Sequence, residues 1–160
     1  MRRLILAATM MLLGVTALIG ARSQPQSAGQ TEINRRFIGT WRLVSIESGT
    51  PNPSRGPRPI GYIYYDATGH MAVQIMPDRA RPSWSGSPTP EQARDAITGY
   101  TAYFGTYTVD ERAQTVTHHR EGSLTPGEVD FVRKFEFAPG DRLILMPVNS
   151  TSRLTWERIR

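Results

Sequence analysis

Short segments of alternating apolar and polar residues follow one another along most of the sequence from residue 40 to residue 158. Segments of this length, bounded by turn residues, are typical of β-strands. Eight antiparallel strands in sequence are enough for a sheet to close on itself. We therefore predict an all-β fold, an eight-stranded antiparallel barrel, with an open sandwich as the alternative. The predicted strands are Thr40–Glu47, Gly61–Asp66, His70–Met76, Thr106–Asp110, Thr115–Ser123, Phe131–Ala138, Arg142–Met146 and Leu154–Arg158.

One helix is predicted between the third and fourth strands. Thr89 is its N-cap, Pro90 takes the first helical position, and Gln92 completes a capping box. An apolar stripe then follows at helical spacing, and we expect it to pack over a mouth of the barrel. The stripe consists of Ala93, Ala96, Ile97 and Tyr100.

The first residues have the composition of a targeting segment. Arg2 and Arg3 precede an uncharged apolar run from Leu4 to Gly20, and small residues follow at Ala21 and Ser23. We predict a signal peptide over residues 1–23 and a periplasmic or secreted mature protein. An uncleaved membrane anchor is the alternative.

The rest of the chain divides into a short spacer and one domain. Residues 24–35 are mostly polar and are predicted to be a disordered spacer, so the domain covers residues 36–160. Loss of residues 1–23 removes three arginines and no acidic residue, which leaves 16 basic and 14 acidic residues. This weak positive charge does not predict nucleic-acid binding. With no cysteine in the chain, the domain depends on its hydrophobic core alone.

The richest group of titratable residues lies in the hairpin from Phe104 to Leu124, whose second strand carries His118 and His119. Adjacent strand residues point to opposite faces, so these two histidines are not expected to bind one metal ion. No phosphate loop or dinucleotide fingerprint is present either. We therefore expect no metal and no other cofactor.

A cluster of charges is predicted where this hairpin meets the sixth strand. Phe131, Phe135 and Phe137 should face the core, and Arg133 shares their face. If Thr117, His119 and Glu121 also point inward, Glu121 can pair with Arg133 beside His119, and His118 lies on the outer face. The cluster would then bind the polar end of a ligand, act as an acid–base pair, or form a purely structural cross-strand pair.

The sequence also resembles a known family. Gly39-Thr40-Trp41 resembles the Gly-x-Trp signature of lipocalins, and Arg158 stands where lipocalins place an arginine over that tryptophan. Such a cation–π contact would close one end of the barrel. The resemblance extends to the bacterial and fungal lipocalin-like domain family and covers about residues 37–159. It is carried by GTWRLVS, GYIYYDATGHMAVQIM, YTAYFGTYTVDERAQTVTHHREGSL, VRKFEF, GDRLIL and LTWERI, in this order.

The resemblance implies a lipocalin-like barrel that binds a small apolar or amphipathic molecule. One alternative is an enzyme on this scaffold that uses His119 and Glu121 for proton transfer in an isomerisation or cyclisation. Another is a non-catalytic envelope protein with a filled barrel. The expected partner is a small molecule, with no membrane span in the mature chain. The predicted ligand-binding residues are Gln74, Tyr103, Tyr107, His119, Glu121 and Arg133.

Overall fold

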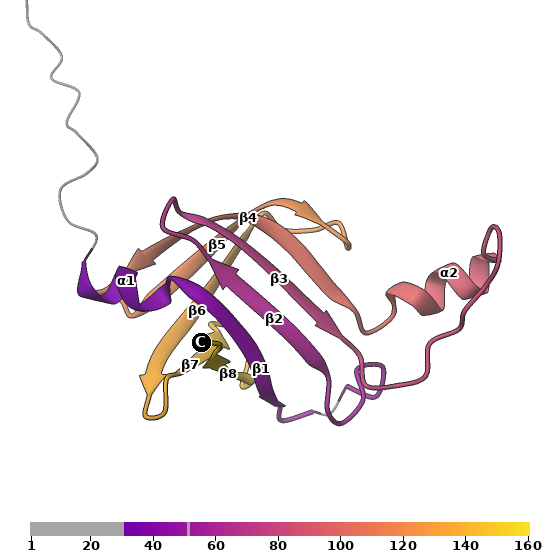
Figure 1. The fold of residues 1–160 in the computed structure, drawn as a ribbon, viewed down its shortest axis with the longest axis horizontal. Helices are drawn as coiled ribbons and strands as arrows, with labels where there is room; N and C mark the ends of the chain where they lie inside the picture. Colours follow the sequence, from indigo (N-terminus) through magenta and orange to yellow (C-terminus); the bar gives the residue numbers. More distant parts are fainter. Residues whose placement is uncertain (1–30, 51) are drawn as a thin grey trace, which may run out of the picture.

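The computed structural model describes residues 31–50 and 52–160. They form a closed antiparallel barrel in which each strand pairs with its neighbour in sequence and β8 pairs with β1 (Figure 1). The predicted all-β barrel, with a helix between the third and fourth strands, is confirmed. The strands are β1 (Gly39–Glu47), β2 (Ile60–Tyr65), β3 (His70–Met76), β4 (Thr101–Asp110), β5 (Thr115–Ser123), β6 (Asp130–Ala138), β7 (Arg142–Pro147) and β8 (Arg153–Arg158). The helices are α1 (Glu32–Phe37) and α2 (Pro90–Ile97).

Contacts between β1 and β8 hold the barrel shut. Trp41 lies opposite Arg158 in the register of the two strands, and the Arg158 guanidinium carbon lies 4.1 Å from the centroid of the Trp41 ring. Arg158 also donates hydrogen bonds to the carbonyl oxygens of Arg36 and Ile38. The closing pair of strands is therefore tied to the chain segment that precedes β1.

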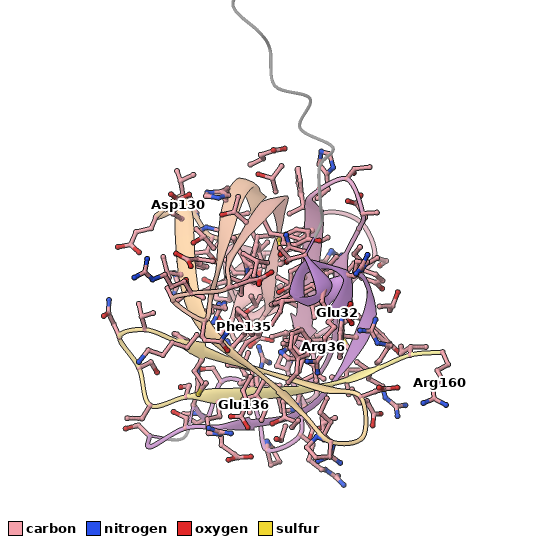
Figure 2. The ribbon with its side chains drawn as sticks, turned by 90° about the vertical axis from the view of Figure 1, so that its left-hand side faces the viewer. Glu32, Arg36, Asp130, Phe135, Glu136 and Arg160 are labelled. Carbon is pink, nitrogen blue, oxygen red and sulfur yellow. The ribbon has the colours of Figure 1, made fainter. Side chains whose placement is uncertain are left out.

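Helix α1 closes one end of the barrel, and the sequence analysis did not predict it. The spacer expected over residues 24–35 thus ends in helix, while residues 24–30 lie outside the described part of the chain. Phe37, the last residue of α1, is fully buried and packs edge-on against Tyr65, Phe135 and Phe137. Figure 2, viewed from this side, shows α1 in front of the strands. One aromatic ring therefore plugs this end.

Helix α2 begins as predicted but does not cover the barrel. Thr89 and Gln92 form the capping box, yet α2 has no buried residue, and Ile97 is 49% exposed. Arg79 donates hydrogen bonds to the carbonyl oxygens of Asp95 and Thr98, so polar contacts hold the end of the helix. The predicted packing of its apolar stripe over the mouth is wrong, because two alanines supply little apolar area. In Figure 1, α2 extends away from the strands.

No helix in the described residues is both long and apolar enough to cross a membrane. The predicted signal peptide, residues 1–23, lies outside the described part of the chain.

Replacement of Phe37 by alanine tests the plug. Loss of a fully buried ring leaves a cavity among Tyr65 and Phe135, so Phe37→Ala should lower the free energy of unfolding by about 3–5 kcal/mol in urea denaturation. Phe104→Ala is the control, because Phe104 is 57% exposed on the outside of β4, and its loss should cost less than about 1 kcal/mol. Equal losses in the two variants would contradict the role assigned to Phe37.

Candidate functional site

The two halves of the barrel interior differ. The half next to α1 is filled, mainly by the rings of Phe37, Trp41, Tyr65, Tyr107 and Phe135. The other half holds a cavity of about 270 Å³. Its apolar wall includes Ile63, Val73, Ile75, Phe131, Leu145 and Leu154. Its polar lining includes Arg55, Thr101, Tyr103, His118, Arg133 and Ser152.

A chain of hydrogen bonds runs through the interior beside the cavity. His118 is fully buried; its Nε2 lies 2.7 Å from the Tyr65 hydroxyl and its Nδ1 lies 2.9 Å from the Tyr103 hydroxyl. A neutral imidazole donates from one nitrogen and accepts at the other, while a tyrosine hydroxyl can do either. Both ring nitrogens are thus satisfied by protein groups, and neither is free to bind a ligand or take a proton from one.

Burial determines the protonation state of these hydrogen-bonded side chains. It lowers the pKa of His118 well below the ordinary range of histidine, and the positive charge of Arg133 lowers it further. Burial also raises the pKa of Tyr65 well above its ordinary value. At neutral pH the imidazole of His118, which lies between the two tyrosine hydroxyls, is therefore neutral and not protonated.

The predicted orientation of β5 is wrong. His118 lies opposite Phe131 and Val116 lies opposite Arg133, so His118 shares the interior face with Arg133. His119 and Glu121, expected inside, therefore do not reach the cavity. Val116 is the one apolar side chain of β5, so its face is the one expected to be buried. His118 lies on the same face as Val116, and this pattern could have corrected the prediction.

The outward residues of β5 make their own contacts. His119 Nδ1 lies 2.8 Å from Asp130 Oδ1, and its Nε2 lies 3.0 Å from Thr108 Oγ1. Glu121 is exposed at a bulge, where β4 pairs with Arg120 and Gly122 and skips the residue between them. Asp130 lies at the edge of the molecule in Figure 2. The predicted acid–base pair of His119 and Glu121 thus has no access to the interior.

The remaining predicted ligand residues fall into three places. Tyr103 lines the cavity through its buried ring. Tyr107 lies in the filled half, where its hydroxyl donates a hydrogen bond to the carbonyl oxygen of Asp66. Gln74 is exposed on the outside of β3. Of the six predicted residues, only Tyr103 and Arg133 line the cavity.

Arg133 lines the cavity without a charged partner. Among the described residues, no carboxylate oxygen lies within 4.0 Å of its guanidinium nitrogens, although six other arginines do meet a carboxylate. Its guanidinium carbon lies 5.6 Å from the centroid of the Phe131 ring. The predicted pair between Arg133 and Glu121 is absent, because the two side chains lie on opposite sides of the sheet.

Arg55 is a second cation in the cavity, and the sequence analysis missed it. Its guanidinium donates a hydrogen bond of 3.1 Å to Thr101 Oγ1. Burial lowers the pKa of Arg55, and the positive charge of Arg133 lowers it further. Arginine still remains charged at neutral pH, so two cations line one cavity. Arg55 lies in a loop rich in proline, where no strand or helix periodicity predicts which way a side chain points.

Two close backbone contacts position the loop that carries Arg55. Gly56 and Gly99 have φ values of 76° and 77°, and a Cβ at either would lie 2.1 Å from a backbone oxygen, that of Asp78 or Ser54 respectively. Only glycine fits both the backbone conformation and the space. These contacts fix the loop on both sides of Arg55 and hold its side chain at the cavity.

Two buried N–H groups at this site have no hydrogen-bond partner among the described residues. They are Arg55 Nε and Trp156 Nε1. The Trp156 side chain is only 1% exposed, and both residues line the cavity. A buried donor without a partner costs about 1–3 kcal/mol, a cost that a hydrogen bond to an acceptor would remove. Within the described residues, no group of three His, Asp or Glu side chains is suited to hold a metal ion.

Comparisons with known proteins identify the type of domain. The family model described as a lipocalin-like domain matches residues 38–160. No curated protein matches the sequence. A solved structure with a similar fold is that of a DUF4847 family protein from Bacteroides vulgatus ATCC 8482, with 14% sequence identity and a TM-score of 0.44. The alignment covers 78% of this chain and 96% of that protein.

The low pKa of His118 predicts a loss of stability in mild acid. Below about pH 6.5 the unfolded chain binds a proton at His118 that the folded protein does not, so the free energy of unfolding falls as the pH falls. In urea denaturation between about pH 7.5 and about pH 5.5, His118→Gln should lose less stability than the wild type. Gln74→Ala, a change at an exposed position on the outside of β3 that carries no titratable group, should lose as much stability as the wild type. If His118→Gln lost as much unfolding free energy as the wild type over this pH range, the assignment would be contradicted.

Proposed function

Because the chain belongs to the lipocalin-like domain family, we propose that its barrel binds a small amphipathic molecule in the interior cavity. The single observation that carries the proposal is the half-filled interior: aromatic rings fill one half, and a cavity of about 270 Å³ remains in the other. A barrel that needed only a stable core would gain from filling this space, since each buried methylene contributes about 0.8 kcal/mol.

The lining of the cavity supports an amphipathic ligand. Most of the wall is apolar, with Val73 and Ile75 on β3 and Leu145 and Leu154 on the opposite side of the barrel. The polar residues form the smaller part of the lining, and an apolar pocket with some polar groups is the usual composition of a site that binds a small organic molecule. The volume lies just below the range of about 300–1,000 Å³ common for drug-sized ligands, so the ligand is compact.

The cavity also has a route to solvent. Ile46, Arg55 and Ser152 line both the inner cavity and an outer groove formed by the loop between β1 and β2. This groove lies at the end of the barrel opposite α1, the end at which α2 is attached (Figure 1). A ligand can therefore enter there without opening the aromatic plug.

We also propose that the protein is exported and that its targeting segment is removed. The basis is the sequence of residues 1–23, with its basic start, apolar run and small residues before a polar stretch. The domain would then take up its ligand in the periplasm or outside the cell.

Native mass spectrometry of protein expressed from the full-length sequence, purified without detergent, tests the binding proposal. The expected result is a reproducible bound mass of a small organic molecule. Val73→Phe should reduce the bound fraction at least about fivefold, because the larger ring occupies part of the cavity. Val44→Phe is the matched control, since Val44 is 43% exposed on the outside of β1. Bare protein from several host extracts would argue for an empty, non-binding barrel.

The export proposal has its own test. Periplasmic protein expressed from the full-length sequence in a bacterium should begin at Gln24, or at Arg22 if cleavage follows Ala21. N-terminal sequencing gives the answer directly. An intact N-terminus on protein that stays with the membrane fraction would instead indicate an uncleaved anchor.

A further inference from the structure

Among the described residues that line the cavity, the buried side-chain polar atoms without a partner are hydrogen-bond donors. Arg55 Nε and Trp156 Nε1 are buried N–H groups that lack an acceptor in the described part of the protein. The Arg133 guanidinium also lines the cavity and adds several N–H donors. By contrast, the two nitrogens of His118 are already satisfied by tyrosine hydroxyls. A ligand that satisfies these groups therefore has to carry a hydrogen-bond acceptor.

The charge of the cavity points to the same kind of group. Arg55 and Arg133 both line it, and the positive charge of Arg133 acts on Arg55, His118 and Tyr65. No carboxylate pairs with either arginine within the described residues, whose ion pairs all involve other side chains. Partly buried cations without a counter-charge are costly, and an anion that enters the site offsets that cost.

We infer that the ligand is a compact amphipathic carboxylate whose anionic group lies between Arg55 and Arg133. This inference rests on the proposed function and specifies the chemical class of its ligand. A carboxylate has two oxygens with about four lone-pair sites, and a guanidinium can meet both oxygens with paired donors. Arg55 and Trp156, which line the same cavity, carry further N–H donors that lack a partner among the described residues.

The position of the cations sets the direction of the ligand. Arg55 lines both the cavity and the outer groove, so the charged group lies toward solvent. The apolar part extends along Val73, Ile75 and Leu145 toward the barrel centre. In this orientation the carboxylate keeps partial contact with water at the mouth, which lowers the cost of its desolvation.

The glycines beside Arg55 have a specific role in this arrangement. Because Gly56 packs against the backbone of Asp78 and Ser54 packs against Gly99, both neighbours of Arg55 are fixed, and the Arg55 guanidinium is held in place before the ligand arrives. A cation that is already fixed loses less side-chain entropy on binding. Selectivity for the anion therefore depends on the loop as well as on the charge itself.

Matched pairs of ligands test the inference. Hexanoate, octanoate and decanoate are compared with the primary alcohols of the same chain length, by titration of the protein expressed from its full-length sequence and purified. Trp156 lines the cavity, so its fluorescence reports on binding, and calorimetry provides the dissociation constants. The best-fitting carboxylate should bind at least about tenfold more tightly than its alcohol, as expected for a hydrogen bond to a charged group.

Two variants assign the preference to the arginines. Arg133→Leu and Arg55→Leu should each reduce the preference for carboxylate to about threefold or less, while binding of the alcohol is kept. Arg42→Leu is the matched control, because Arg42 pairs with Glu157 on the outside of the barrel and should leave the preference intact. Binding of the alcohol shows that a variant has folded and kept its cavity.

The outcomes separate this inference from the proposed function. If carboxylates and alcohols bind equally well, or if both arginine variants keep the wild-type preference, the anionic site is refuted and the binding barrel stands. If neither ligand class binds and no mass co-purifies with the protein, the proposed function fails, and the inference fails with it.

Discussion

The pairing of β1 with β8 is the constraint on which the rest of the structure depends. It turns a sheet of eight strands into a barrel and so creates an inside. Arg158 lies over Trp41 at this seam, and the Trp41 indole donates a hydrogen bond to the carbonyl oxygen of Phe37. The same contacts that close the sheet thus bring the Phe37 ring into the barrel end. The filled half is a consequence of closure, and the cavity is what remains.

The buried polar groups of the barrel interior are of two kinds, those with hydrogen-bond partners in the protein and those without. The chain of Tyr65, His118 and Tyr103 is internally complete, with each imidazole nitrogen at hydrogen-bond distance from a hydroxyl. Arg55 and Arg133, a short way along the same cavity, have donors but no acidic partner in the described residues. A satisfied network stabilises and fixes a core, whereas an unsatisfied one is a cost that binding can remove. This difference is the physical basis for separating a structural histidine from a ligand site.

The sequence predicts the fold of this protein better than its site. Alternation, turn residues and the capping box at Thr89 led to the strand order and to α2, because these signals are local. The direction of His118 and His119 depends on which face of β5 meets β6, and this register is a tertiary property. The bulge at Glu121 also changes the alternation within that strand. Arg55 could not be predicted, because its direction is set by contacts of Gly56 and Gly99 with distant backbone.

The seam of the barrel also sets the order in which the protein can fold. Arg42 and Glu157 form an ion pair across it although they are separated by 115 positions in the sequence. During synthesis β1 lacks its second neighbour until β8 has left the ribosome, and its edge is open for all of that time. Contacts of such long range slow folding, because the chain pays the entropy of loop closure first. Closure of the barrel therefore has to wait for β8, and until β8 is available the outer edge of β1 keeps unpaired backbone N–H and C=O groups.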